Sequence, residues 1–125
     1  MEKVKEYENG LRLVVKPMSG MFTVSMGVIV NTGSVNETAE NNGISHYIEH
    51  MLFKGTKKRT SFEISDAIDS LGSQINAYTA KENTCFYVKS TRENFAASAE
   101  ILSDIFFHSV FDDEESAREK GVILE

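Results

Sequence analysis

The sequence predicts an α+β domain in which helices pack on one face of a largely antiparallel sheet. Strand-like segments come in pairs joined by short turns, and amphipathic helical segments lie between and after these pairs. No strict strand–helix–strand repeat is present, which argues against a parallel sheet. With 125 residues, of which 41% are hydrophobic, the chain is long enough to form one domain with its own core.

The first thirty residues are expected to form strands. Residues 4–7 and 11–16 flank Glu8-Asn9-Gly10, and Asn-Gly is the strongest short signal for a β-hairpin. Residues 22–30 then alternate between two faces of a further strand. The face predicted to join the core consists of Phe22, Val24, Met26, Val28 and Val30. Residues 31–43 are polar and contain glycine, so we predict a loop there.

A helix, a second hairpin and another helix are expected after residue 59. Thr60 and Glu63 form a capping-box pattern before an apolar stripe that ends at Gly72. Residues 74–79 and 83–90 are strand-like runs around a short turn. Thr91 is a candidate cap for a long helix. The apolar face of that helix would be Phe95, Ala99, Leu102, Ile105 and Phe106.

The clearest chemical signal is the segment His46-Tyr47-Ile48-Glu49-His50. On a helix, His46, Glu49 and His50 would project from one face. Two imidazoles one turn apart can reach a single Zn²⁺, and a carboxylate between them is placed to accept a proton from water at the metal. The order H-x-x-E-H is the inverzincin signature. This segment therefore predicts a metal site.

Two other interpretations of the segment compete with a catalytic metal site. A histidine on an apolar helix is often a core residue, and short patterns arise by chance. The other faces of the helix carry Ile44, Tyr47, Ile48, Met51 and Leu52, which predicts a buried helix where uncompensated polar groups are unfavourable. A structural zinc is disfavoured because such sites hold four protein ligands rich in cysteine, and Cys85 is the only cysteine.

Composition and charge restrict the partners and the location. A net charge of −6 argues against a nucleic-acid partner, and no segment approaches the about 18 apolar residues that cross a membrane. The basic run at residues 54–59 (KGTKKR) is predicted as a solvated loop, with guidance of acidic substrates as the alternative. Cys85 excludes an internal disulfide and is expected to be a small buried residue. Residues 1–10 lack an apolar signal region, so we expect a soluble, cytoplasmic protein.

Three motifs follow one another along the chain: HYIEHMLFKGT (residues 46–56), LGSQINAYT (71–79) and REKGVILE (118–125). Together they resemble the pitrilysin family, and within it most closely the bacterial relatives of the mitochondrial processing peptidase β subunit. The similarity covers essentially the whole chain. It implies a zinc endopeptidase that cleaves peptides or unfolded, presequence-like segments held in extended form within a clamshell of homologous domains.

The resemblance also implies roles for individual residues. His46 and His50 would bind Zn²⁺, and Glu49 would be the general base. The family has two later glutamates seven residues apart: Glu119 matches the one that supports the site, and the one that binds the metal would be residue 126. Glu125 is a weak substitute because neighbours on a helix point about 100° apart.

The resemblance further implies that residues 1–125 are the N-terminal part of a peptidase domain. The helical pattern of residues 117–125 has no C-terminal capping signal, so the domain is expected to be truncated there. The partner would then be the remaining part of the parent chain or a homologous subunit, with a homo-oligomer as a further expectation. The competing function is a non-catalytic homologous subunit that binds peptides or stabilises an assembly; the intact H-x-x-E-H segment favours the enzyme.

Asn76, Ala77 and Tyr78 resemble the edge strand that receives substrate by strand addition in this family. The alternative is that Asn76 and Tyr78 only pack and cap a hairpin. His108, at the end of the long helix, is predicted to interact with the helix dipole rather than to bind a metal.

Overall fold

The computed structural model describes residues 2–111 and Ala117, and within these residues it confirms the α+β class. The element order is β1 (Lys3–Glu6), β2 (Arg12–Val15), β3 (Thr23–Val30), the 3-10 helix η1 (Ser34–Asn36), α1 (Ile44–Leu52), α2 (Ser61–Ser70), β4 (Gln74–Thr79), β5 (Thr84–Thr91) and α3 (Phe95–His108). The helix predicted from about residue 112, together with Glu119 and Glu125, lies outside the described residues.

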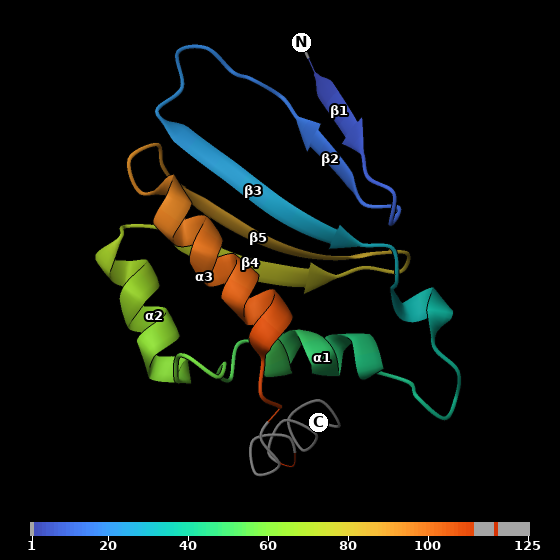
Figure 1. Ribbon diagram of the computed structural model, residues 1–125. Coiled ribbons are helices and arrows are strands. Elements are labelled where there is room, and N and C mark those ends of the chain that lie inside the picture. The colour runs from blue at the N-terminus through green and yellow to red at the C-terminus, as the bar shows by residue number, and fades with distance from the viewer. Residues whose placement is uncertain (1, 112–116, 118–125) are drawn as a thin grey trace.

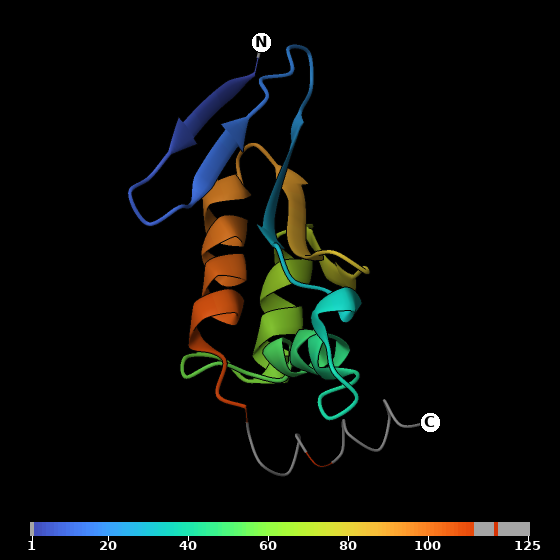
Figure 2. The same cartoon turned by 90° about the vertical axis from the view of Figure 1, so that its right-hand side faces the viewer.

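The main sheet has three antiparallel strands in the order β3-β5-β4. The central strand β5 places Phe86 opposite both Val28 of β3 and Ala77 of β4. Helices α2 and α3 cover one face of the sheet, and α1 lies against β4 (Figure 1, Figure 2). Among the described residues, β4 pairs only with β5 and is therefore an edge strand. The predicted arrangement of helices on one face of an antiparallel sheet is confirmed.

The core lies between β5 and the three helices. Its buried residues are Leu52, Ile64, Ile68, Phe86, Val88, Ile101, Leu102 and Ile105. Met26 and Val28 of β3 are half-buried and pack against this cluster, as their alternation predicts. The assignment of Phe22 to the core face is wrong: its side chain is 79% exposed. The β3–β5 ladder begins one residue later, at the pair Thr23–Thr91, so Phe22 lies just outside it.

A local capping signal explains where α2 begins, but no side-chain cap marks the start of α3. The capping box before α2 is confirmed, because the Glu63 amide donates to Thr60 Oγ1 at 3.1 Å and the Thr60 amide donates to Glu63 Oε1 at 3.2 Å. Thr91 does not cap α3, because it is the last residue of β5. Asn94 precedes α3 instead, and its side-chain Nδ2 donates to the Leu71 carbonyl at 2.9 Å.

Strands β1 and β2 form a separate hairpin, as the Asn-Gly pair predicts. Gly10 has φ +91°, in the left-handed region that glycine adopts at low cost. The hairpin stands at one end of the molecule, away from the helices that cover the main sheet (Figure 1). In the part of the chain that the structure describes, no helix combines the length and apolar character needed to cross a membrane.

Candidate active site

Helix α1 brings His46, Glu49 and His50 onto one face, as their spacing predicts. The Nε2 atoms of His46 and His50 are 2.8 Å apart. The two rings meet edge to face, with centroids 4.3 Å apart and an interplanar angle of 90°. The imidazole nitrogens of the two histidines therefore converge on one point in space.

The convergence of these nitrogens can be tested against the geometry of a metal site. Two nitrogens that each bind Zn²⁺ at about 2.0–2.1 Å in tetrahedral geometry lie roughly 3.3 Å apart. The observed 2.8 Å between the two Nε2 atoms is close to this spacing, and a small ring rotation reaches it. Within the described ranges, no cluster of three or more His, Cys, Asp or Glu side chains is placed to hold a metal. Two histidines are fewer than the three protein ligands of a catalytic zinc site.

Helix α1 is less buried than its apolar composition predicts. Ile44 is 42% exposed and Ile48 is 38% exposed, whereas Met51 and Leu52 are buried. The expectation of a fully buried helix is wrong for these two residues, because only the C-terminal turn of α1 reaches the core. The imidazole of His46 is accordingly accessible, and Glu49 and His50 are half-buried.

The carboxylate of Glu49 contacts the edge strand. Thr79, the last residue of β4, donates a hydrogen bond from Oγ1 to Oε2 of Glu49. Thr79 belongs to the sequence motif of the strand, but sequence alone assigns no role to its side chain. The two residues are 30 positions apart, so only the fold brings the hydroxyl to the carboxylate.

An open cleft of about 500 Å³ lies between α1 and β4. It is lined by Ser34, Glu37, Gly43, His46, Glu49, Ala77, Tyr78 and Thr79. The structure therefore brings Ala77 and Tyr78 together with His46 and Glu49. Asn76 instead lines a second cavity of about 520 Å³ that also contains Ser65 and Asp69 of α2. A single edge strand thus borders two cavities.

Tyr78 packs against the central strand at the border of the cleft. Its side chain is 50% exposed, and its ring centroid lies 6.4 Å from that of Tyr87. The pKa of Tyr78 is raised above its ordinary value. The main cause is a hydrogen bond with the Cys85 thiol, and the second is the charge of Cys85. Cys85 is buried, as predicted. The phenol therefore stays neutral at the border of the cleft.

Glu37 holds the N-terminus of α1, a role that sequence analysis missed. Its carboxylate accepts the backbone N–H of Ser45 at 2.8 Å and that of Gly43 at 3.0 Å. These two bonds lower the pKa of Glu37 below its ordinary value of 4.5, and the bond from Ser45 has the larger effect. The turn signal at residues 41–43 indicates a helix start, but the cap comes from Glu37, eight positions before Ser45.

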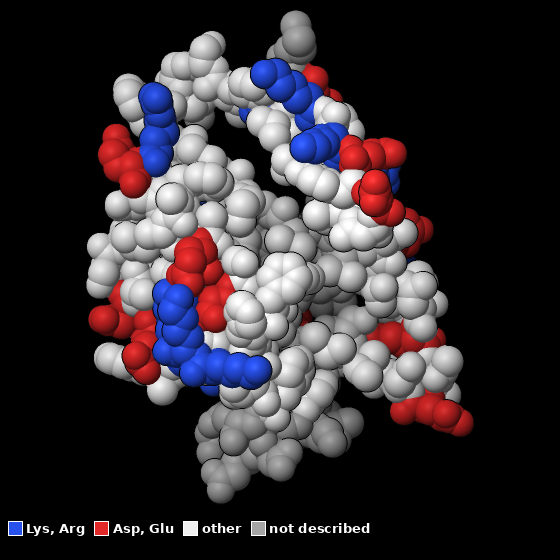
Figure 3. Space-filling model, in the orientation of Figure 1, with Lys and Arg blue, Asp and Glu red and all other residues white. Residues whose placement is uncertain are grey.

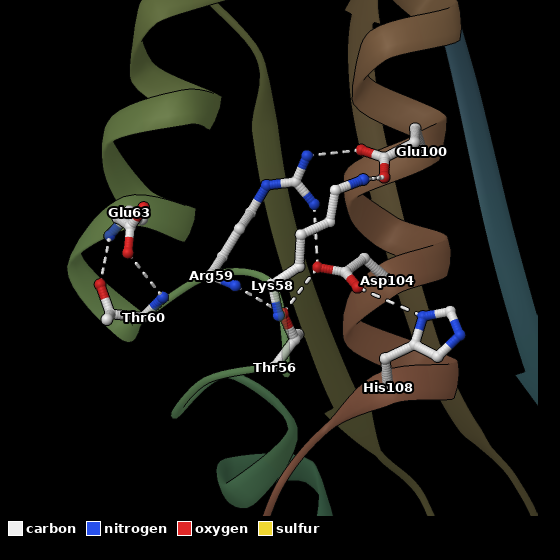
Figure 4. Close-up of polar contacts among 8 residues, drawn as sticks. All are labelled: Thr56, Lys58, Arg59, Thr60, Glu63, Glu100, Asp104 and His108. Carbon is white, nitrogen blue, oxygen red and sulfur yellow. Dashed lines mark hydrogen bonds and ion pairs between the residues drawn. The ribbon is translucent and has the colours of Figure 1, made fainter.

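The basic run after α1 is attached to α3 (Figure 4). Thr56 Oγ1 and Arg59 Nη1 donate to Asp104 Oδ2 at 2.7 and 2.8 Å. Arg59 Nη2 also donates to Glu100 at 2.6 Å, and Lys58 Nζ pairs with Glu100 at 2.8 Å. The expectation of a solvated loop is wrong for Thr56, which is buried, and for Arg59, whose side chain is only 19% exposed. Paired in this way, these charges stabilise the fold.

Asp104 is the centre of this cluster. Burial raises the pKa of its carboxyl, but the hydrogen bonds from Thr56 and Arg59 outweigh burial and lower the pKa below its ordinary value of 3.8. The hydrogen bond to Glu100 in turn raises the pKa of Arg59. His108, the last residue of α3, places Nδ1 3.2 Å from Asp104 Oδ1. His108 thus lies at the C-terminus of α3, and its interaction with the helix dipole remains a prediction.

Charged residues of both signs lie side by side on the face shown in Figure 3. Lysine and arginine side chains there are close to aspartate and glutamate side chains rather than gathered into one basic surface. A continuous basic surface is the usual feature of nucleic-acid binding. The expected absence of a nucleic-acid partner remains a prediction.

The sequence of this chain is similar to known peptidases. Residues 13–125 match the family model described as Insulinase (Peptidase family M16). The chain is 44% identical to the uncharacterized zinc protease YmxG of Bacillus subtilis, over 98% of this chain and 30% of that protein. It is 43% identical to the mitochondrial-processing peptidase subunit beta of Rattus norvegicus, over 94% of this chain and 24% of that protein.

A solved structure shows the same fold. The crystal structure of a protease from Helicobacter pylori matches with a TM-score of 0.90 and 26% sequence identity, covering 98% of this chain and 30% of that one. The chain thus spans less than a third of the length of these relatives. The match of the family model over most of the chain confirms the resemblance to the pitrilysin family. The chain belongs to the insulinase family of peptidases, M16.

Proposed function

We propose that this chain forms the N-terminal part of a longer zinc-dependent endopeptidase that cleaves peptides or unfolded segments. The observation that carries the proposal is the convergence of His46 and His50, whose Nε2 atoms are 2.8 Å apart on the helix that also carries Glu49. Membership of the M16 family and the similarity to two relatives, a zinc protease and a processing peptidase subunit, support it.

His46 and His50 would hold the metal, with a third protein ligand from residues outside the described ranges. When bound, Zn²⁺ would polarise the scissile carbonyl and lower the pKa of a water molecule toward about 7. Glu49 is adjacent to both histidines and would accept the proton of the attacking water, then pass it to the leaving amine. The supporting role of Glu119 remains a prediction.

The edge strand β4 would bind the substrate as an added strand. Its outer edge has no partner strand among the described residues, and a peptide that pairs there would displace the Asn76 side chain, whose Oδ1 accepts the Ala77 N–H at 2.8 Å. Because Ala77, Tyr78 and Thr79 line the same cleft as His46 and Glu49, a peptide on β4 would pass directly in front of the general base. Tyr78 would then contribute to side-chain preference.

The test compares the longer protein with its Glu49→Gln and His50→Ala variants. Glu49→Gln should keep zinc and fold but lose cleavage of a quenched fluorogenic peptide by about 10²–10⁴-fold, because an amide cannot accept the proton. His50→Ala should lose zinc. Glu40→Gln, in the exposed loop before α1, is the matched control and should cleave normally.

The outcomes separate the enzyme from a binding-only subunit. Undiminished cleavage by Glu49→Gln would refute the role of Glu49, and equal zinc content in wild type and His50→Ala would refute the metal assignment. A wild-type protein that binds peptide and zinc but never cleaves would favour the non-catalytic subunit. Such a subunit has no need of a general base beside two convergent imidazoles.

A further inference from the structure

The side chain of Thr79 connects two parts of the proposed site. It belongs to β4, the edge strand, and donates its hydroxyl to Oε2 of Glu49 on α1. Thr79 is half-buried and lines the same cleft as His46 and Glu49. An ionised carboxylate can only accept hydrogen bonds, so the hydroxyl of Thr79 is necessarily the donor. The strand and the carboxylate are therefore in direct contact.

The hydroxyl of Thr79 is held more firmly than the carboxylate that it contacts. Thr79 is β-branched, which restricts its χ1 angle, and its backbone pairs with Thr84 of the central strand β5. The terminal torsion of a glutamate is broad, so a carboxylate on an accessible helix face samples many orientations. A hydrogen bond from a fixed hydroxyl selects one of them.

We propose that Thr79 is a positioning residue for Glu49. By engaging Oε2, it leaves Oε1 to receive the proton from the attacking water, and it fixes the distance between the base and the strand that receives the peptide. The inference rests on the proposed function, because it assigns a task to Glu49 as general base. It predicts that loss of the hydroxyl lowers kcat and leaves KM unchanged.

Thr84 provides a matched control on the neighbouring strand. It lies directly opposite Thr79 in the β4–β5 register, and its Oγ1 donates to the Thr32 carbonyl at 2.8 Å instead of to Glu49. Thr→Val at either position removes one hydroxyl from the same cross-strand pair, Thr79–Thr84. Only the change at position 79 removes a contact to the general base.

The experiment uses the longer protein with zinc supplied. Wild type, Thr79→Val, Thr79→Ser, Thr84→Val and Glu49→Gln are compared for kcat and KM on one fluorogenic peptide, and for zinc content. Thr79→Val should lower kcat by about 10-fold, the size expected for one hydrogen bond to a charged group, with zinc content and KM unchanged. Thr79→Ser, which keeps the hydroxyl, should recover most of this loss. Thr84→Val should keep the wild-type kcat.

Several results would overturn the role of Thr79. Wild-type kcat in Thr79→Val, with Glu49→Gln inactive, would show that the base needs no support from β4. Equal losses in Thr79→Val and Thr79→Ser, or in Thr79→Val and Thr84→Val, would assign the effect to the strand rather than to the hydroxyl. Full cleavage by Glu49→Gln would instead refute the proposed function, and the role of Thr79 with it.

Discussion

Replacing Asp104 by asparagine should loosen the segment that follows α1. The Asp104 side chain is only 5% exposed, and Oδ2 accepts hydrogen bonds from both Thr56 and Arg59. Asparagine has nearly the same shape, but it has no charge and only one accepting oxygen. The substitution therefore tests the ion pair and its hydrogen bonds with little change in packing.

The expected magnitude follows from how completely the pair is buried. Removing one member of a fully buried ion pair costs about 3–5 kcal/mol. Arg59 is 19% exposed and keeps its 2.6 Å bond to Glu100, so part of its charge remains compensated. We therefore expect about 2 kcal/mol of local stability to be lost, which corresponds to a roughly 30-fold larger population of the locally open state.

Hydrogen–deuterium exchange of the longer protein measures this loss where it occurs. Amides in residues 54–60 and in the C-terminal half of α3 should exchange faster in Asp104→Asn, and those of the β1–β2 hairpin should not. Asp66→Asn, an exposed aspartate on α2, is the control. Unchanged amide exchange around Arg59 in Asp104→Asn would refute a stabilising role for the Asp104 contacts.

The pH dependence of this difference has a defined sign. The pKa of Asp104 is lower in the folded protein than its ordinary value of 3.8, so the stabilisation is complete above pH 3.8 and is lost as pH falls through the lower folded value. The difference between wild type and Asp104→Asn should therefore be present at pH 7 and should disappear in strong acid. A difference that is largest in acid would contradict this assignment.

Two further predictions concern the cleft and the length of the chain. Glu37→Gln should lose about 1 kcal/mol at the N-terminus of α1 and speed amide exchange at residues 43–47 by roughly 5-fold, with Glu40→Gln unchanged. The pKa of Glu37 is lowered from 4.5, so the stability difference between wild type and Glu37→Gln should be complete above pH 4.5 and should vanish as pH falls through the lower folded value. A difference that persists in acid would count against the cap. The 125-residue chain alone should be inactive and hold zinc poorly, because catalytic zinc sites have three protein ligands. Full peptidase activity of that chain, measured with zinc supplied, would overturn the proposed need for further ligands.

The features that could be predicted from sequence depend on residues close together in the chain. The capping box of Thr60 and Glu63 spans three positions, and the spacing of His46 and His50 spans four. Alternation also identified the core side of β3, although it does not show where a ladder ends, and Phe22 was misplaced for that reason. Local periodicity therefore predicts faces and turns well.

The features that were missed join residues far apart in the chain. Thr79 and Glu49 are separated by 30 positions, and Thr56 and Asp104 by 48. No propensity or short motif contains this information, since it depends on which strand becomes the edge and which helix packs beside it. The polarity of residues 54–59 indicated a solvated loop. The acidic partners of Lys58 and Arg59 lie on α3, more than 40 positions later, so the local sequence could not reveal these ion pairs.

Three sets of polar contacts fix α1 at its start, its middle and its end. Glu37 holds its first amides, Thr79 contacts Glu49 in its middle, and the cluster around Asp104 anchors the segment that follows its last turn. The helix contributes little burial of its own, because only Met51, Leu52 and Ser45 are buried. Catalytic groups require positions fixed to within about 0.5 Å, which a weakly packed helix does not provide alone. In the proposed enzyme, the polar contacts would supply that restraint while the imidazole of His46 remains open to the cleft, where a substrate on β4 would meet it.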